Sequence, residues 1–482
     1  MTVEAAQAQP NAVAARPADL APVANAATLL DHGLAGLRVV VLDVLATGLR
    51  AADPVAAVDE AVTVSGSSLR VGGRSFDLDD YGAVVVLGAG KASLSIAAGL
   101  ERKLGDRIDR GLVVRRRGQP GGLDRIEVLD ADHPVPSEAS LVAGRRLVDA
   151  AGQCRPGDLL ITAFTGGSSA LACVPPDGVD FVAKQALHAM LLDSGASIAE
   201  VNTVRKHVSQ IKGGRLAALA NGATIVNLTL SDVVGDAVDL LCDVVVPDST
   251  DCDGAVAVLR RYGLWEAVDP AIRAHLSTPE AESPSLAGLD ITTTVLVTGA
   301  TVVDRMAERV RALGCTPAIL GTSLAGDGGA LGALLGSLAS ESSVHGRPFA
   351  AGTVLVAAGG EATVSIQRRE GVTIGAGGPN QEVAVAFARA VAGGARAAAG
   401  FVDSDGSDGG TEAAGGCVDS STLPSARAMG VDLDSALIRH DCQSTLERLG
   451  DLVVTGPTGT NISDLLVVAI ETSTAEPGTG PS

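Results

Sequence analysis

Aromatic residues are scarce in this chain of 482 residues, which has one Trp, two Tyr and six Phe. Hydrophobic residues still make up 46% of the sequence, so the predicted cores are built mainly from Val, Leu, Ile and Ala. The chain has no run of about 18 apolar residues without charge, which argues against a membrane-spanning helix. Its length exceeds that of one ordinary core and predicts two or three domains.

Basic residues are also fewer than acidic ones. The chain has 36 Lys and Arg residues against 56 Asp and Glu residues, giving a formal net charge of -20. This acidity argues against nucleic acid and anionic membrane surfaces as partners. The seven cysteines are odd in number and form no CxxC pair. That pattern favours reduced cytoplasmic thiols over a disulfide framework or a zinc site.

The two ends of the chain have the composition of disordered tails. Residues 1–27 are rich in Ala, Pro and Val but lack the basic and compact apolar regions of a signal peptide. Residues 472–482 contain two Pro and two Gly residues and are expected to fray. The cytoplasm is therefore the expected location.

Strands and helices are predicted to alternate along the chain. Residues 83–87 form an apolar run that leads through a glycine turn into a predicted helix at 92–100. Such βα units predict a doubly wound parallel sheet, whose functional loops gather at the carboxyl ends of its strands. A helix at 29–48 is expected to enter this first domain, and a Pro-containing stretch at 278–284 to leave it. The predicted domains are 28–285 and 286–471. Further strands are predicted at 111–115, 158–164, 223–230, 293–298, 354–358, 398–402 and 452–455.

Residues 202–217 concentrate basic side chains in an acidic protein. This segment holds Arg205, Lys206, His207, Lys212 and Arg215, and it ends in a Lys-Gly-Gly sequence. A local positive cluster of this kind favours a small anionic ligand such as a phosphate or carboxylate. Glycines would let backbone N–H groups approach the anion closely. The alternative is a solvated helix face.

Two glycine-containing turns follow predicted strands. Gly88-Ala-Gly-Lys91 could cradle phosphate oxygens, with Lys91 as the point charge, although such a turn is often structural. Residues 165–170, Thr-Gly-Gly-Ser-Ser-Ala, offer hydroxyl groups and backbone donors. The alternative for this second turn is an ordinary helix N-cap.

Three further loops carry polar chemistry. Residues 231–236 and 404–409 each supply two aspartates, Asp232 with Asp236 and Asp405 with Asp408. Such pairs can hold Mg²⁺ or act as a base on a hydroxyl, but Asp and Gly also build turns. Residues 455–464 are too polar and glycine-rich for a simple connector and favour an anion or metal site.

The order and the residue sequences of these loops resemble those of the class II glycerate kinases. The resemblance spans about residues 29–470, and its most specific parts are the Asn-Thr-Val-Arg-Lys-His stretch at 202–207 and the Thr-Gly-Pro-Thr-Gly-Thr-Asn stretch at 455–461. The other matching stretches are Gly88–Ala92, His133–Pro136, Thr165–Leu171, Ser231–Asp236, Gly359–Glu361, Asn380–Glu382 and Ser404–Gly409.

The resemblance implies ATP- and Mg²⁺-dependent transfer of a phosphoryl group to a hydroxyl of D-glycerate, giving 2-phosphoglycerate. It implies a Rossmann-like N-terminal domain, a smaller α/β C-terminal domain and a site in the cleft between them. Lys91 matches the active-site lysine of the family, and Asp232 is the candidate base. The candidate metal ligands are Asp236, Asp405 and Asp408. The candidate substrate or phosphate contacts are Gly88, Gly90, Gly166, Gly167, Ser168, Ser169, Asn202, Arg205, Lys206, Lys212, Gly213, Gly214, Asn380, Glu382, Thr458 and Asn461.

Three positions depart from the family pattern. Pro379 stands where the family has an arginine before Asn-Gln-Glu, Asp132 replaces a glycine, and residues 242–244 replace a Ser-Gly-Pro turn.

The expected partners are a small anionic substrate and ATP, and the protein is a possible homodimer. Alternatives to a glycerate kinase are a kinase for another acceptor such as a phosphonate analogue, a hydroxypyruvate reductase-type oxidoreductase, and a catalytically degenerate binding protein.

Overall fold

The chain divides into two compact units in a computed structural model that describes residues 20–231, 244–366, 371–391 and 394–473. The parallel-sheet unit comprises Pro54–Val297 and Gly459–Asn461. The mixed-sheet unit comprises Met1–Asp53, Thr298–Thr458 and Ile462–Ser482. Each unit has its own six-stranded sheet.

The sheet of the parallel-sheet unit has the strand order of a doubly wound fold. Its six strands are all parallel, in the order β6-β5-β4-β7-β8-β9. Chain order therefore reverses between β4 and β7, where such folds bind their ligands. Both central strands are buried at every position, as expected for continuous apolar runs covered on both faces. The strands are β4 (Val84–Ala89), β5 (Arg110–Arg116), β6 (Glu127–Ala131), β7 (Leu159–Phe164), β8 (Thr224–Leu230) and β9 (Ile291–Val297).

Helices of this unit pack against the sheet and against one another. A small antiparallel sheet of β1 (Thr63–Ser65), β2 (Ser68–Val71) and β3 (Arg74–Asp77) adds to the unit. The helices α7, α8, α10 and α11 share a hydrophobic core of their own. The helices are α3 (Pro54–Ala61), α4 (Ser93–Leu104), α5 (Glu138–Gly152), α6 (Ser168–Leu171), α7 (Phe181–Asp193), α8 (Ile198–His207), α9 (Arg215–Leu219), α10 (Cys252–Arg261) and α11 (Pro270–His275).

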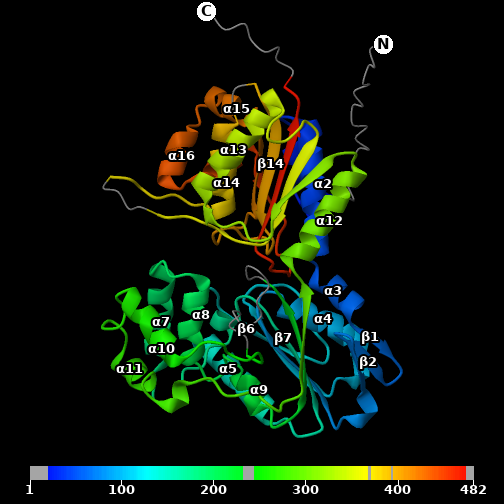
Figure 1. Cartoon of the computed structure of the whole chain (residues 1–482), viewed down its shortest axis with the longest axis vertical. Helices are drawn as coiled ribbons and strands as arrows, with labels where there is room; N and C mark the ends of the chain where they lie inside the picture. Colours follow the sequence, from blue (N-terminus) through cyan, green and yellow to red (C-terminus); the bar gives the residue numbers. More distant parts are fainter. Residues whose placement is uncertain (1–19, 232–243, 367–370, 392–393, 474–482) are drawn as a thin grey trace, which may run out of the picture. The chain divides into compact units, whose positions relative to one another are not determined.

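The mixed-sheet unit has the strand order β10-β12-β17-β14-β15-β16, in which only the β10–β12 pair is parallel. Helices α2 and α12 lie on one face of the sheet and α13 and α14 on the other (Figure 1). Phe387 of α14 packs against Phe401 of β14 with ring centroids 5.8 Å apart. The strands are β10 (Thr316–Gly321), β11 (Gly326–Asp327), β12 (Thr353–Ala358), β13 (Ala362–Thr363), β14 (Arg396–Asp403), β15 (Gly415–Asp419), β16 (Leu452–Val453) and β17 (Asp464–Glu471).

The remaining helices belong to the same unit. In the part of the chain that the structure describes, no helix is both long enough and apolar enough to cross a bilayer. The helices are α1 (Ala26–Leu30), α2 (Ala35–Ala51), α12 (Gly299–Ala312), α13 (Gly328–His345), α14 (Pro379–Ala390), α15 (Thr422–Ala428), α16 (Leu433–Arg439) and α17 (Cys442–Leu449).

The units divide the chain differently from the sequence prediction. Helix α2, expected to enter the first domain, belongs to the mixed-sheet unit, and β9, expected after the boundary at residue 285, completes the parallel sheet. Gly400 in β14 lets α2 approach, because a Cβ there would lie 2.5 Å from Leu45 Cδ1 and 2.8 Å from Val41 Cγ1. The boundary therefore falls between β9 and α12.

Candidate active site

The turns after β4 and β7 are joined by hydrogen bonds at the point where strand order reverses. The backbone N–H of Lys91 donates to the Gly166 carbonyl at 2.9 Å, and that of Ala92 donates to Thr165 Oγ1 at 3.1 Å. Gly90 has a φ of +143°, and a Cβ there would lie 2.2 Å from Thr165 Oγ1. Gly88 lies inside β4, where a Cβ would meet the Ala163 carbonyl at 2.6 Å. The first glycine therefore serves strand packing, and the second brings the two turns together.

The side chains of Lys91 and His133 both lie close to Gly167. A Cβ on Gly167, whose φ is +85°, would lie 3.2 Å from His133 Cδ2 and 3.3 Å from Lys91 Cγ. Gly167 precedes α6, which begins at Ser168 and also contains Ser169. The glycine thus leaves room for two nitrogen-bearing side chains beside a polar turn.

The basic segment 202–217 reaches the same turn through Lys212. The Nζ of Lys212 donates to Ser168 Oγ at 2.7 Å, and both side chains are buried. The basic segment therefore places one buried ammonium group directly on the turn that contains Ser168.

A second cation of the segment, Arg205, donates to a histidine. Its Nη2 lies 2.9 Å from His188 Nε2, which must accept and therefore carries no proton. Burial and, after it, the neighbouring Arg205, Lys184, His133 and Lys212 lower the pKa of His188 to about 3. We call Lys91, Lys184, Arg205 and Lys212, together with the neighbouring His133 and the neutral His188, the cationic cluster. The positive charge of this cluster favours an anionic ligand.

Other members of the predicted anion site have different surroundings. Lys206 Nζ donates to Asp248, and both side chains are almost fully buried. The positive charge of Lys206 is therefore balanced by a carboxylate within the fold. Gly213 and Gly214 have positive φ, and a Cβ would meet Ser283 Oγ at 2.5 Å and Leu286 Cδ1 at 2.8 Å, respectively. Close packing accounts for these two glycines. Asn202 is buried on α8.

In the mixed-sheet unit, Asp408 caps a helix. Its carboxylate accepts from the backbone N–H groups of Asn380 at 3.1 Å and Gln381 at 2.9 Å, in the first turn of α14. Pro379 is the first residue of this helix, where the missing N–H is not needed. The position of Pro379 is therefore compatible with the fold, and Asp408 has a structural role that the sequence could not distinguish from metal binding.

Asn380 links Asp408 to a second acid that was not singled out in the sequence. Its Nδ2 donates to Asp464 Oδ1 at 2.7 Å, and Asp464 Oδ2 accepts from the Ala362 backbone at 2.8 Å. Burial raises the pKa of Asp408 to about 6 and that of Asp464 to about 7. The value for Asp464 already includes smaller upward contributions from the carboxylates of Asp408 and Glu361.

The remaining predicted residues of this unit are held by local contacts. Glu382 Oε2 lies 2.8 Å from His440 Nδ1. Asp405 Oδ1 accepts from the Ser407 backbone at 2.8 Å, and Thr458 Oγ1 donates to the Ser404 carbonyl at 2.5 Å. Asn461 is buried and is assigned to the parallel-sheet unit.

The predicted metal ligands do not come together among the described residues. Asp232 and Asp236 lie outside the described residues. Asp405 and Asp408 join no group of three His, Cys, Asp or Glu side chains close enough to share one ion, within the ranges that the structure covers. Such a group does exist elsewhere, formed by His207, Cys252 and Glu282.

Comparison with known proteins assigns the family. Residues 40–277 match a family model described as a domain of unknown function, DUF4147, and residues 354–464 match the MOFRL family. The chain is 36% identical over 442 residues to the glycerate 2-kinase of Pyrococcus horikoshii, covering 91% of this chain and 98% of that protein. The chain belongs to the class II glycerate kinase family. It is therefore an enzyme, a kinase with a hydroxyl group as acceptor, and its kinase relatives imply the use of ATP.

A solved structure supports the same assignment. The glycerate kinase of Thermotoga maritima has a TM-score of 0.75 and 32% identity, covering 90% of this chain and 99% of that chain. A relative from Agrobacterium vitis, 36% identical over 390 residues, is named provisionally as a hydroxypyruvate reductase. It covers 81% of this chain and matches over 100% of its own length. The predicted fold class and family are thus confirmed.

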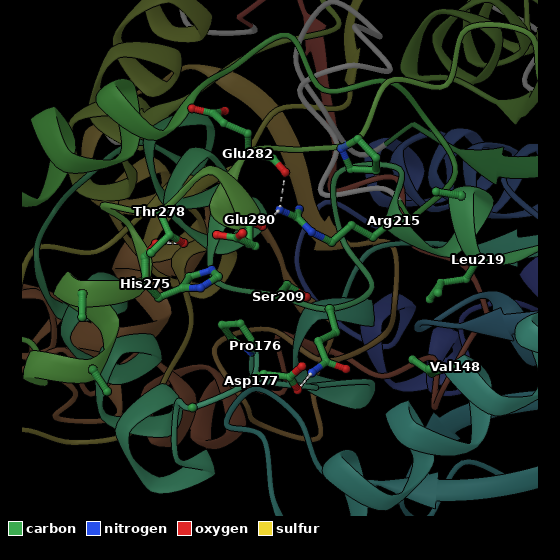
Figure 2. Close-up of a pocket in the computed structure, with 16 residues that line it drawn as sticks. Val148, Pro176, Asp177, Ser209, Arg215, Leu219, His275, Thr278, Glu280 and Glu282 are labelled. Atoms are coloured by element: carbon green, nitrogen blue, oxygen red, sulfur yellow. Dashed lines mark hydrogen bonds between the residues drawn. The ribbon is translucent and has the colours of Figure 1, made fainter.

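This class II glycerate kinase also has a pocket beside the basic segment 202–217. The pocket has a volume of ≈ 860 Å³ and lies in the parallel-sheet unit, lined by residues that include Ser209, Arg215, His275 and Glu282 (Figure 2). Lys91, Ser168 and Lys212 are not among its lining residues. His188 and Lys184, which belong to the cluster, were missed in the sequence because they lie on a helix without any motif.

Proposed function

We propose that this enzyme transfers a phosphoryl group from ATP, with Mg²⁺, to a hydroxyl of D-glycerate and forms 2-phosphoglycerate. The observation that carries the proposal is the cationic cluster at the reversal point of a doubly wound sheet. Phosphoryl transfer depends mostly on positioning and on neutralising charge on the transferring oxygens. Buried cations beside glycine turns suit that task.

Lys91 would contact the transferring phosphoryl group. Lys212 and Arg205 would hold anionic groups of the substrates, and the turn at Gly166 and Gly167 would add backbone N–H donors. The acceptor hydroxyl would attack the γ-phosphorus, the bond to the ADP oxygen would break, and Asp232 would take the hydroxyl proton.

Asp408 does not fit a Mg²⁺ site by itself, because both of its carboxylate oxygens accept from N–H groups of α14. Mg²⁺ in kinases commonly uses one or two carboxylates together with phosphate oxygens. Asp236 therefore remains the proposed carboxylate for this role, with Asp232 as the proposed base.

Pro379 favours a second candidate, a kinase for another short hydroxy acid or a phosphonate analogue. The family arginine at this position would offer a planar guanidinium for an anionic group, and proline offers none. A loss of this kind bears on the acceptor more than on the phosphoryl donor.

The test is ATP consumption with Mg²⁺ over a panel of D-glycerate, L-glycerate, other short hydroxy acids and phosphonate analogues. The product would be located by ³¹P NMR, and oxidation of NADH with hydroxypyruvate would be measured in parallel. We expect turnover of D-glycerate and none of hydroxypyruvate. Lys91→Ala should abolish turnover with an unchanged circular dichroism spectrum. Lys103→Ala is the matched control, since this lysine of α4 pairs with Asp59. Wild-type turnover by Lys91→Ala would refute the assignment of Lys91.

A further inference from the structure

His207, Cys252 and Glu282 form a three-residue cluster that shares no residue with the cationic cluster. They come from three separate segments: the last residue of α8, the first residue of α10, and the loop after α11. Their ligand atoms all lie within 4.8 Å of one another. The Nε2 of His207 and Oε2 of Glu282 are 3.6 Å apart. Two ligands of a tetrahedral ion with bonds of about 2.0–2.3 Å are separated by about 3.3–3.7 Å.

The tautomer of His207 suits a metal ligand. Its Nδ1 lies 2.8 Å from the Thr203 carbonyl, which can only accept, so Nδ1 carries the proton. In the neutral ring the lone pair is then on Nε2, which faces Glu282. Metal-binding histidines are usually oriented by this kind of N–H contact to a carbonyl or carboxylate.

The Nε2 atom lacks a hydrogen-bond partner among the described residues, and the His207 side chain is 0% exposed. The nearest carboxylate oxygens are 3.6 Å away on Glu282 and 3.8 Å away on Asp248. Both distances are too long for a hydrogen bond. A buried polar atom without a partner in a native fold needs an explanation, and a bound cation provides one.

The surroundings of the three ligands support a cation. The backbone N–H of Cys252 donates to Glu282 Oε1 at 3.1 Å and orients that carboxylate. Asp248 adds a second negative group beside His207, while its own oxygens accept from Lys206, Thr250 and Ser283. Asp248 therefore serves as an outer neighbour of the cluster.

Glu282 provides a route for the ion. Its side chain is 49% exposed and lines the ≈ 860 Å³ pocket together with Arg215 and His275 (Figure 2). Cys252 and His207, in contrast, are buried. An ion could enter from the pocket, reach the two buried ligands and keep one coordination position open to water.

The donor set selects the metal. A thiolate, an imidazole and a carboxylate suit Zn²⁺, whereas Mg²⁺ prefers oxygen ligands and near-ideal octahedral geometry. We propose that His207, Cys252 and Glu282 bind one Zn²⁺ ion that ties the end of α8 to the start of α10. Binding would remove the proton of Cys252 and pass it to solvent. None of these three ligands is among the residues proposed for Mg²⁺.

The test measures zinc bound to the full-length protein without a purification tag. Protein freed of metal with EDTA would be incubated with ZnCl₂ and desalted, and its zinc content measured by mass spectrometry. Wild-type protein is expected to hold one ion per chain, and Cys252→Ala less than a tenth of that. Cys315→Ala is the matched control, because Cys315 is a free cysteine of the mixed-sheet unit.

Two further measurements keep the proposal falsifiable if one variant folds poorly. Glu282→Gln changes a partly exposed side chain and should weaken zinc affinity about tenfold or more. Cobalt loading of the wild-type protein should produce a thiolate-to-cobalt charge-transfer band that Cys252→Ala lacks. Absence of stoichiometric zinc in the wild type, or equal zinc in the wild type and a folded Cys252→Ala protein, would overturn the proposal.

Discussion

The Nε of Arg38 lies 2.5 Å from Oδ2 of Asp419, and both side chains are almost fully buried in the mixed-sheet unit. The same guanidinium reaches Asp451 Oδ1 at 2.7 Å. Arg38 belongs to α2, so this ion pair fixes an N-terminal helix to strand β15 nearly four hundred residues later. Burial opposes ionisation of Asp419, but Arg38 and several N–H and O–H donors hold its pKa below the usual range.

Arg38→Ala is expected to destabilise the fold strongly. Removing one partner of a buried ion pair leaves an uncompensated charge and typically costs about 3–5 kcal/mol. The measurement is the free energy of unfolding from urea titration. Arg102→Ala is the matched control, because its pair with Asp59 is exposed to solvent and should contribute little to stability. Equal stability of the two variants would contradict the structural role of Arg38.

The position of α2 shows where sequence reasoning reached its limit. The sequence predicted a helix at this position and assigned it to the first domain, but its many apolar residues do not show which sheet buries it. The parallel sheet was easier to predict, because strands such as β4 are continuous apolar runs that end in glycine turns. The family resemblance predicted both domains. The boundary predicted at residue 285 was too early, because β9 pairs with β8 and so belongs to the parallel sheet.

The candidate site, too, could be predicted from the sequence only in part. The turns at Lys91 and Ser168 could be predicted to meet, since parallel strands bring their carboxyl ends to one edge. The partner of Lys206 could not be predicted, because Asp248 lies 42 residues away in a segment without a motif. The sequence also argued against zinc, because no CxxC pair is present. Ligands from three distant segments leave no such spacing.

Asp464 is expected to make stability depend on pH. Its pKa is raised in the folded state to about 7, so the fold favours the neutral carboxyl. That contribution is fully present below the unfolded value near 3.8 and is lost as the pH rises through about 7. Asp464→Asn keeps an acceptor for Ala362 and should flatten the dependence of unfolding free energy on pH across this window. An unchanged slope would show that Asp464 is ionised in the fold.

His188 should give the opposite dependence of stability on pH. Burial and neighbouring cations lower its folded pKa to about 3, so the neutral ring is favoured. This contribution is present above the unfolded value of 6.5 and is lost as the pH falls toward about 3. His188→Gln retains an acceptor for Arg205 and should reduce acid sensitivity in urea titrations between these pH values. An imidazole that titrates near 6.5 by NMR would contradict the prediction.

Lys212→Ala should weaken substrate binding more than it weakens folding. A hydrogen bond from a charged group contributes about 1.5–3 kcal/mol, which corresponds to roughly a 10- to 150-fold change. We expect kcat/KM to fall by about this factor for the anionic substrate, with Lys103→Ala as the control. A Lys212→Ala protein with wild-type kcat/KM would place the bound anion away from Ser168.

Pro379→Arg tests whether the departure from the family pattern controls the acceptor. Pro379 is the first residue of α14, a position that arginine can occupy, so the loss of stability should be within about 1 kcal/mol. A regained guanidinium contact of about 1.5–3 kcal/mol predicts a rise of roughly tenfold or more in kcat/KM for D-glycerate. Pro379→Ala removes the ring without adding charge and should give no such rise. If both variants match the wild type in steady-state kinetics and stability, position 379 does not select the acceptor, and another residue compensates for the family arginine.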